Sequence, residues 1–344
     1  MLIATPAPNT RATLAPWKIN RRGFLGAAGA AGLLVISVRN SGLATGAPAS
    51  GPVTIQHRFG QTTIPAPPKR VVSAGFTEQD DLLAVGVVPI AVTLWWGDEP
   101  YEVWPWAQPK LGSARPEVLS IYDGGIQFDR IAALRPDLIV AINAGVDQDS
   151  YNRLSAIAPT IPQSGDAPFF EPWKTQATTI GQATFQSDMV QSLITAADNR
   201  FPAVAKANPQ FRGKNALLLQ GTIFQDQVGA TLPGWRTDFL TQMGFRIPDS
   251  INAFTIDEHR AFIPRDQIVS VLNTADVLIW TTQSAADEAG LRADPTIQQL
   301  NATAQNLNVF TGKEFAGAIA FSSPPSLPVV ANQLPPMLNA ALNH

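Results

Sequence analysis

PWKTQATTIGQATFQSDMVQSLITAADNRFPAVAKA, residues Pro172–Ala207, is the longest segment with a helical pattern, and it lies between two halves of the chain that follow one plan. Its second part, positions 190 to 205, repeats apolar residues at the spacings of one helix face. Pro172 suits a first helical position and Ser187 an N-cap, whereas Pro202 lacks an amide donor and should bend or end a helix. We therefore expect two helical pieces in line that span about 40–50 Å.

The composition is that of a folded chain long enough for two domains. Of the 344 residues, 45% are hydrophobic and 15% are charged. Residues 1–50 hold five of the 24 basic residues and none of the 27 acidic ones, so the remainder has a net charge of −8. This charge argues against nucleic acid or an anionic membrane surface as a partner. The sequence has no cysteine, which excludes disulfides, thiolate metal sites and a lipobox acceptor within it.

The first fifty residues contain the parts of an export signal. Arg21 and Arg22 precede Phe24 and a weakly apolar run, and small residues end at Ala49. This order is typical of a twin-arginine signal peptide, here residues 1–49. The apolar run is shorter than the roughly 20 residues of a spanning helix, and an uncleaved membrane anchor is the alternative. In both cases we expect the protein to work in the periplasm or cell envelope, outside the cytoplasmic membrane.

Residues 50–170 predict an N-terminal α/β lobe that opens with a hairpin. Residues 53–59 and 62–64 read as its two strands, with a turn at Gly60-Gln61. Further strands are expected at 70–73, 87–93 and 137–142, and helices at 77–85, 128–134 and 147–157. Short apolar strands separated by helices indicate a parallel sheet covered on both faces.

Residues 209–344 predict a second lobe of the same kind, and residues 171–208 the bridging helix. Strands are expected at 216–220, 277–281 and 307–310, and helices at 235–243, 265–272, 294–302 and 326–342. One pair of segments is close to an internal repeat, because Asp129 leads to a Pro-Asp-Leu-Ile-Val strand as Asp266 leads to an Ala-Asp-Val-Leu-Ile strand. We infer an α/β fold of two Rossmann-like lobes with parallel sheets, joined by a single long helix, with the ligand cleft between the lobes.

Aromatic residues gather where such a cleft would lie. Ligands of open α/β sheets bind beyond the carboxyl ends of the strands. Four of the eight tryptophans fall between positions 95 and 106, directly after a predicted strand. Trp95 and Trp96 are the better candidates for a ligand wall, whereas Trp104 and Trp106 could equally cover the core.

The sequence lacks the common enzyme and metal motifs. It has no G-x-S-x-G, no H-E-x-x-H and no P-loop, and only three histidines. We therefore expect neither an enzyme nor a directly coordinated transition metal. Arg236 could hold an anionic ligand by charge-assisted hydrogen bonds, although a solvated surface charge is the plainer interpretation.

Several stretches resemble the substrate-binding proteins of ATP-driven importers for iron-siderophores, ferric citrate and vitamin B12, and most closely the actinobacterial iron-siderophore branch. They include HRFGQTTIPAPPKRVVSAGFTEQDDLLAVGVVPIAV at 57–92, FDRIAALRPDLIVA at 128–141, TADVLIW at 274–280 and AIAFSSPPSLPVV at 318–330. The resemblance implies a shallow cleft and an acid in each lobe that docks onto permease arginines. By local motif these acids are Asp129 and Asp266, where the family commonly has glutamate.

The sequence and the resemblance together predict an exported protein, expected to be monomeric, that captures a ferric siderophore or a related chelate and delivers it to an ABC importer. Iron would be carried within the chelate, so no cofactor and no protein metal ligand are expected. Alternatives are heme or corrinoid binding on the same fold, with Tyr101 as an axial heme ligand, and a secreted α/β hydrolase. The expected ligand-binding residues are Phe76, Trp95, Trp96, Tyr101, Asn143, Trp235, Arg236 and Trp280.

Overall fold

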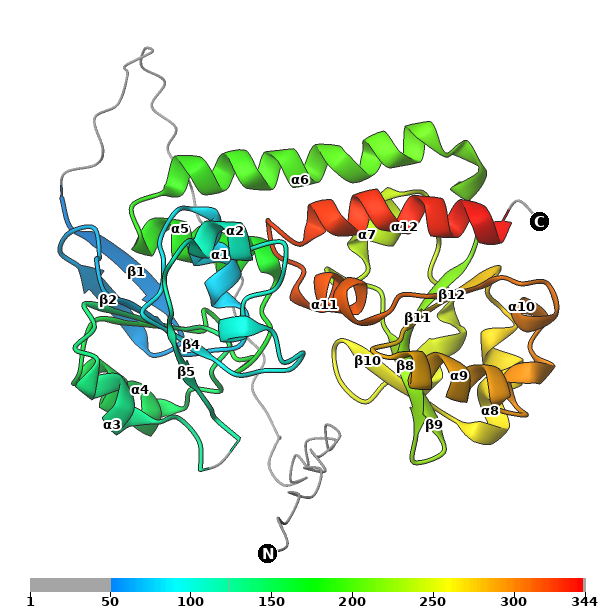
Figure 1. Ribbon diagram of the computed structural model, residues 1–344, viewed down its shortest axis with the longest axis horizontal. Helices are drawn as coiled ribbons and strands as arrows, with labels where there is room; N and C mark the ends of the chain where they lie inside the picture. Colours follow the sequence, from blue (N-terminus) through cyan, green and yellow to red (C-terminus); the bar gives the residue numbers. More distant parts are fainter. Residues whose placement is uncertain (1–50, 123, 343–344) are drawn as a thin grey trace, which may run out of the picture. The chain divides into compact units, whose positions relative to one another are not determined.

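A computed structural model describes residues 51–122 and 124–342. The expected signal peptide, residues 1–49, lies outside the described residues. Two α/β lobes follow one another along the chain, the first in blue to green and the second in yellow-green to red (Figure 1). No helix in the described ranges is both long and apolar enough to cross a membrane.

The first lobe contains a five-stranded parallel sheet with the order β5-β4-β3-β6-β7. Its strands are almost entirely buried, as expected for a sheet with helices on both faces. The strands are β3 (Val71–Ser73), β4 (Ala91–Thr93), β5 (Glu117–Leu119), β6 (Leu138–Ala141) and β7 (Thr160–Pro162). The sequence patterns missed β5 and β7.

An antiparallel hairpin of β1 (Val53–His57) and β2 (Gly60–Ile64) precedes this sheet. His57 pairs with Gly60, so the turn lies at Arg58-Phe59 rather than at the expected Gly60-Gln61. Phe59 is partly buried and stacks on Tyr151 with ring centroids 5.1 Å apart. The turn is therefore fixed by a tertiary contact rather than by glycine alone.

The second lobe repeats the strand order but not the strand directions. Its sheet has the order β10-β9-β8-β11-β12, and β9 runs antiparallel to both neighbours, so the sheet is mixed rather than parallel. The expected loop after residue 220 is instead a hairpin, whose turn residues Gln225 and Asp226 both have positive φ. The strands are β8 (Ala216–Phe224), β9 (Gln227–Thr231), β10 (Arg260–Pro264), β11 (Val277–Thr281) and β12 (Asn308–Phe310).

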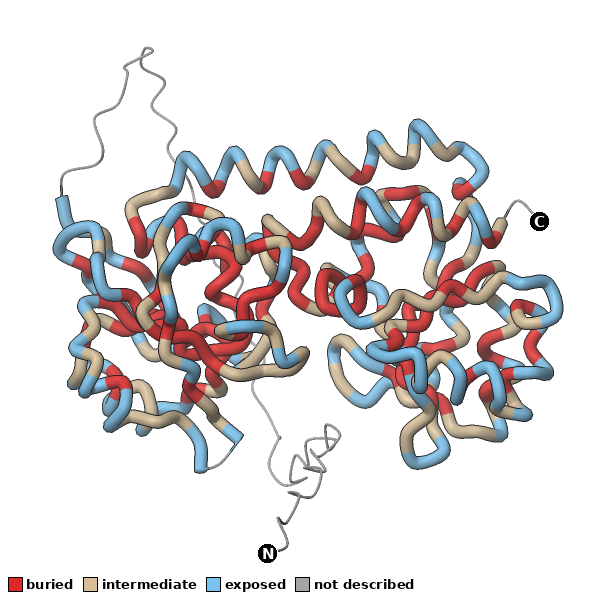
Figure 2. The backbone as a smooth tube through the Cα atoms, in the orientation of Figure 1, coloured by how far each residue is buried: buried red, intermediate tan, exposed pale blue. Residues whose placement is uncertain are grey.

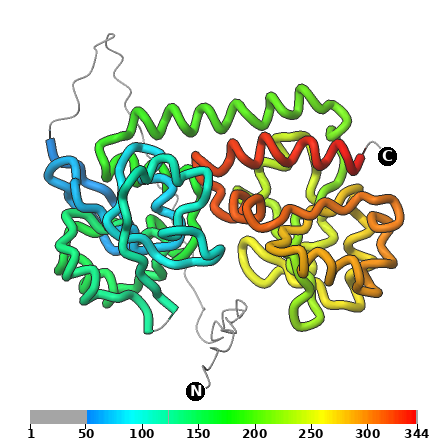
Figure 3. Tube along the Cα trace, viewed as in Figure 1, coloured from blue at the N-terminus to red at the C-terminus, as the bar shows by residue number. Residues whose placement is uncertain are grey.

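The central helical segment folds back on itself. Helix α5 (Trp173–Ala183) and helix α6 (Ser187–Ala207) pack as an antiparallel pair, because Lys174 bonds Asp198 at 2.5 Å while Gly181 lies against Val190. The two pieces are therefore not in line, and α6 alone makes the crossing between lobes (Figure 3). Its 21 residues span about 31 Å at 1.5 Å each.

Two local expectations about this segment were wrong, and Pro202 does not end the helix. Pro172 is the N-cap of α5, and Ser187 is the first residue of α6 rather than its cap. Pro202 lies inside α6, which continues to Ala207. The face of α6 that packs on α5 and α12 is buried, while the opposite face is exposed, as Figure 2 shows. Tertiary packing of this face outweighs the hydrogen bond that Pro202 removes.

The remaining helices cover the sheets. Those of the first lobe are α1 (Glu78–Ala84), α2 (Gln108–Leu111), α3 (Phe128–Ala133) and α4 (Gln148–Ser155), with a 3-10 turn at Pro100–Glu102. Those of the second lobe are α7 (Asp238–Gln242), α8 (Arg265–Leu272), α9 (Ala285–Ala293), α10 (Asn301–Ala304), α11 (Lys313–Phe321) and α12 (Leu327–Leu342), with 3-10 turns at Pro209–Phe211, Asp249–Phe254 and Ile297–Gln299. Helix α12 packs beside α6 (Figure 1).

Candidate functional site

Five aromatic residues of the first lobe form one wall, which we call the aromatic wall: Phe76, Trp95, Trp96, Phe169 and Phe170. Phe76 lies at its centre, with ring centroids 5.7 Å from Trp95, 5.7 Å from Phe169 and 6.1 Å from Phe170. These residues lie in the loops that follow β3, β4 and β7, at the carboxyl edge of the parallel sheet. The topology therefore places them where α/β sheets bind ligands.

Phe170 is held in place by its backbone. Its φ is 60°, a left-handed value that is unfavourable for a residue with a ring side chain. The amide of Phe170 donates a short hydrogen bond to Oδ1 of Asn143. Phe169 lies against Gly145, where a Cβ would come within 2.3 Å of its ring. Both rings are thus positioned by the loop after β6.

Asn143 supports the wall from behind. Its side chain is 2% exposed, and its Nδ2 donates to Thr77 Oγ1 at 2.6 Å and to Gln176 Oε1 at 2.9 Å. Since both ends of the amide are occupied, Asn143 has no free group for a ligand. The structure therefore gives it a positioning role, contrary to the expected ligand contact.

A pocket of about 210 Å³ lies between Trp96 and the second lobe. Its floor comes from β8, β11 and α11, and its polar groups are mostly amides and hydroxyls. The lining residues are Trp96, Leu218, Leu219, Gln220, Thr231, Arg236, Thr281, Gln283, Ala316, Ile319 and Ala320. The lining contains no side chain that commonly binds iron, such as His, Tyr, Asp or Glu.

Arg236 is the one charged residue in this lining. Its guanidinium lies 4.8 Å from the ring centre of Phe170 and 4.4 Å from that of Trp235, so it connects the second lobe to the aromatic wall. Burial and the nearby Arg260 lower the pKa of Arg236 to about 10, which leaves it charged at neutral pH. Within the described ranges its N–H groups make no hydrogen bond or ion pair.

Below the pocket the lobes are in direct contact. Gly317 of α11 lies against Trp104, and a Cβ there would meet the ring at 2.5 Å. Phe321 contacts Trp95 at 5.3 Å between ring centroids, and Lys313 bonds Glu99 at 2.8 Å. Trp104 is 1% exposed, so its role is packing between the lobes.

The first turn of α1 holds three buried carboxyl groups, Glu78, Asp80 and Asp81, of which Asp80 bonds across this contact. Asp80 accepts from Trp106 Nε1 at 2.7 Å and from Ser323 Oγ of the second lobe at 2.5 Å. Asp81 accepts from Gln176 at 2.6 Å. Burial raises the pKa of Glu78 to about 7 and that of Asp80 to about 6, and it raises the pKa of Asp81 well above its ordinary value.

Three other expected site residues lie elsewhere. Trp280 is fully buried in the core of the second lobe and donates to Asn308 Oδ1 at 2.8 Å, so it cannot pack on a ligand in this structure. Tyr101 is partly buried and packs against the apolar cluster of Leu83 and Val103. Trp235 lies beside Arg236 but lines a second, much smaller space of about 20 Å³.

The structure adds site residues that the sequence patterns missed. Phe169, Phe170, Phe321, Gln220, Thr281 and Gln283 are among them. Tyr122 also belongs here, because its hydroxyl donates to the Trp95 carbonyl at 2.8 Å while its ring stacks on Phe76. Phe169 and Phe170 could have been found in the sequence, because they form an adjacent aromatic pair just before the helical segment.

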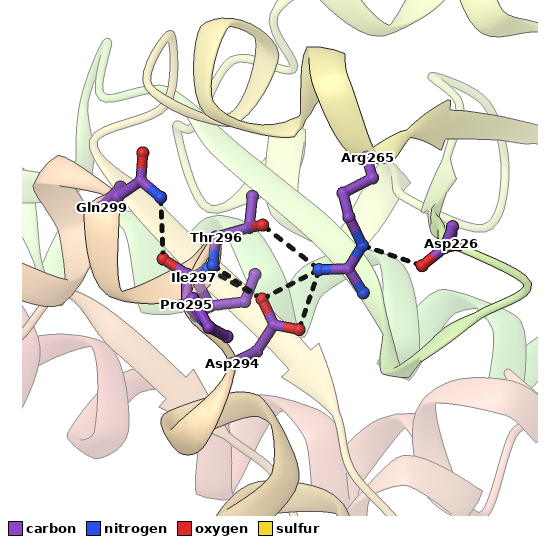
Figure 4. A network of polar contacts seen from close by, with 7 residues as sticks. All are labelled: Asp226, Arg265, Asp294, Pro295, Thr296, Ile297 and Gln299. Atoms are coloured by element: carbon purple, nitrogen blue, oxygen red, sulfur yellow. Dashed lines mark hydrogen bonds and ion pairs between the residues drawn. The ribbon is translucent and has the colours of Figure 1, made fainter.

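Asp129 and Asp266 occupy equivalent places in the first turns of α3 and α8, and both are exposed. The arginine next to each is bound to other acids of its own lobe. Arg130 bonds Glu117, and Arg265 bonds Asp226 and Asp294, each of these two at 2.9 Å (Figure 4). Neither arginine therefore neutralises the neighbouring aspartate.

A profile of the family described as periplasmic binding protein matches residues 71–315. The chain belongs to this periplasmic binding protein family. A periplasmic solute binding protein of Mycobacterium smegmatis is 60% identical, and its crystal structure superposes with a TM-score of 0.81 over 85% of this chain and 99% of that chain.

Two further proteins extend the comparison. The probable siderophore-binding lipoprotein YfiY of Bacillus subtilis is 27% identical over 242 residues, which cover 67% of this chain and 69% of that protein. PiaA of Streptococcus pneumoniae, solved in complex with ferrichrome, is 22% identical with a TM-score of 0.69 over 85% of this chain and 99% of that chain. At that identity PiaA shows a shared fold. The family members found are binding proteins rather than enzymes.

Proposed function

We propose that the protein captures a ferric siderophore between its lobes and delivers it to an ABC importer. The observation that carries the proposal is the pocket between Trp96 and Arg236, which offers ring faces, amides and one guanidinium but no iron ligand. Such a pocket suits iron that is already wrapped in a chelator. The siderophore-binding relative and the ferrichrome complex on the same fold support it.

The direct test is a tryptophan fluorescence titration of residues 50–344. Trp95 and Trp96 would report a ligand in the pocket. We expect saturable quenching by a ferric chelate and little by the same chelator without iron, after correction for absorption by the ligand. If every ferric chelate fails and heme saturates, the siderophore assignment fails.

Heme binding has less support in this geometry. Tyr101, the expected axial ligand, is packed in an apolar cluster of the first lobe. The pocket lining also lacks histidine and tyrosine. A Soret shift that disappears in Tyr101→Phe would revive the heme alternative.

Asp129 and Asp266 are the proposed docking acids for the permease. Each is exposed, and the arginine next to it is bound to other acids of the same lobe. Two such carboxylates could meet permease arginines across a symmetric interface. We expect Asp129→Ala with Asp266→Ala to abolish uptake and to leave ligand affinity unchanged. Asp149→Ala, an exposed acid in the first turn of α4, is the matched control.

Export and oligomeric state complete the proposal. The protein would leave the cytoplasm by the twin-arginine route, be cleaved after Ala49 and act as a monomer in the periplasm or cell envelope. Lysine at both Arg21 and Arg22 should stop export while leaving the folded protein in the cytoplasm. Cell fractionation measures export, and light scattering of residues 50–344 measures the oligomeric state.

A further inference from the structure

The charges around the pocket restrict the kind of chelate that it accepts. Arg236 is the single cation of the lining, and its N–H groups need acceptors from the ligand. Phe170 and Trp235 lie against the guanidinium, with ring centres 4.8 Å and 4.4 Å away, so its N–H groups are what it can offer to a ligand. Oxygen atoms of a ligand can therefore meet it in the plane of the group.

The neighbouring basic residues add little positive charge. Arg260 is bound through two nitrogens to Asp257 at 2.9 Å and 2.7 Å. Burial and Arg236 lower the pKa of His259, so its ring is neutral at neutral pH. Lys313 is paired with Glu99. The second lobe thus offers one unpaired positive charge to the pocket.

The first lobe adds negative rather than positive charge. Asp80 is linked to the aromatic wall by successive contacts, because Trp106 donates to Asp80 and stacks on Trp104 at 5.1 Å, and Trp104 lies 5.0 Å from Trp96 between ring centroids. The pKa of Asp80 is about 6, so this group is ionised at neutral pH. A strongly negative ligand would face this charge across aromatic rings.

We infer that the pocket selects a ferric chelate of zero or one negative charge that presents oxygen acceptors to Arg236, as in the ferric tris-hydroxamates, over the triply negative tris-catecholates. This inference rests on the proposed function. Catechol rings could stack on the aromatic wall, but their complex would leave two of its three charges unpaired in a partly dry pocket. Unpaired charges removed from water cost more than a ring contact returns.

The test is calorimetric titration of residues 50–344 with a ferric tris-hydroxamate and a ferric tris-catecholate at neutral pH. We expect the hydroxamate complex to bind at least about tenfold more tightly. Arg236→Gln should weaken its binding about tenfold, because a charge-assisted hydrogen bond is lost. Arg236→Lys keeps the charge and should retain most of the affinity. Arg260→Gln removes an equal but paired charge and should change affinity by less than about threefold.

The outcomes separate this inference from the proposed function. A catecholate complex that binds as tightly as the hydroxamate, or more tightly, would overturn the inference and leave siderophore binding intact. Equal losses in Arg236→Gln and Arg260→Gln would also overturn it. If neither chelate binds to protein with a native melting temperature, the proposed function and the inference fail together.

Discussion

The two lobes share a strand order but place different chemistry at the carboxyl ends of their strands. The first lobe supplies stacked rings, and the second supplies Arg236 with amide and hydroxyl groups. The two lobes also differ in the ionisable residues that they bury. In the described ranges, the residues of ionisable type that are almost fully buried all belong to the first 171 positions, namely His57, Glu78, Asp80, Asp81, Glu102 and Glu171, whereas Arg236 stays partly exposed. Topology therefore fixes where the loops meet, and the side chains on those loops decide what each lobe contributes.

Two tryptophans make the same point on a smaller scale. Trp96 lies three residues beyond the end of β4 and lines the pocket, whereas Trp280 lies within β11 and is fully buried. Trp96 thus reaches the ligand side of its sheet, while Trp280 packs in the core of the second lobe. For these two residues, position relative to the strand end separates the site from the core.

The largest expected effect is the loss of Trp280. Trp280→Ala removes a fully buried ring and leaves Asn308 without its donor, which should lower the free energy of unfolding by about 3–5 kcal/mol. Trp96→Ala should cost much less stability but should lower ligand affinity by roughly thirtyfold. Urea denaturation and calorimetric titration measure the two effects. Similar stability losses in both variants would remove the distinction between core and site.

A second prediction uses the buried acids of the first lobe. Folding raises the pKa of Glu78 to about 7 and that of Asp80 to about 6, so the native state binds protons more tightly than the unfolded chain between about pH 4 and 7. The free energy of unfolding should therefore fall as pH rises through this window, by up to about 3 kcal/mol for each group. His57 and His259 oppose the trend, because burial lowers their pKa.

Asp81→Asn isolates the contribution of this cluster. The variant keeps an acceptor for Gln176 and removes a buried ionisable group, so its free energy of unfolding at pH 8 should exceed that of the wild type and should depend less on pH. Asp149→Asn, which changes an exposed acid, should leave the pH dependence unchanged. The measurement is urea denaturation at pH 5 and pH 8. Parallel pH profiles in the wild type and Asp81→Asn would show that the cluster does not titrate as described.

The smallest predicted change concerns the contact between the lobes. Gly317→Ala places a Cβ against the ring of Trp104 and should destabilise the protein by about 1–3 kcal/mol. Gly290→Ala, in α9, meets nothing within 4 Å and should instead stabilise by about 0.5–1 kcal/mol. Thermal melting of the two variants measures these opposite changes in stability. A stabilising Gly317→Ala would mean that α11 does not pack on the first lobe as seen here.

Much of the fold could be predicted from periodicity. The strand Val277–Thr281 and the helix Arg265–Leu272 have the predicted bounds, and the repeat that contains Asp129 and Asp266 corresponds to equivalent elements of the two lobes. Strands β9 and β10 could not be found in this way. The turn between β8 and β9 is Gln225-Asp226, which lacks the glycine that usually marks a tight hairpin.

The site was less predictable, because local patterns do not show which face of an element a side chain occupies. Trp95 and Trp96 were predicted from their position after a strand, and the structure brings Trp96 and Arg236 to one pocket. The sequence could not show that Asn143 supports other residues rather than contacting a ligand, because its partner Gln176 is 33 positions away and belongs to α5. Long-range hydrogen bonds of this kind are set by tertiary packing alone.

The most direct test of the account is the position of iron in crystals grown with a bound ferric chelate. An anomalous difference map collected at the iron edge locates the metal without reference to the chelator. We predict one iron peak between Trp96 of the first lobe and Arg236 of the second, with no protein side chain bonded to the metal. Iron bonded directly to a side chain, or a peak outside this pocket, would contradict the claim that the two lobes form one site for a chelated ion.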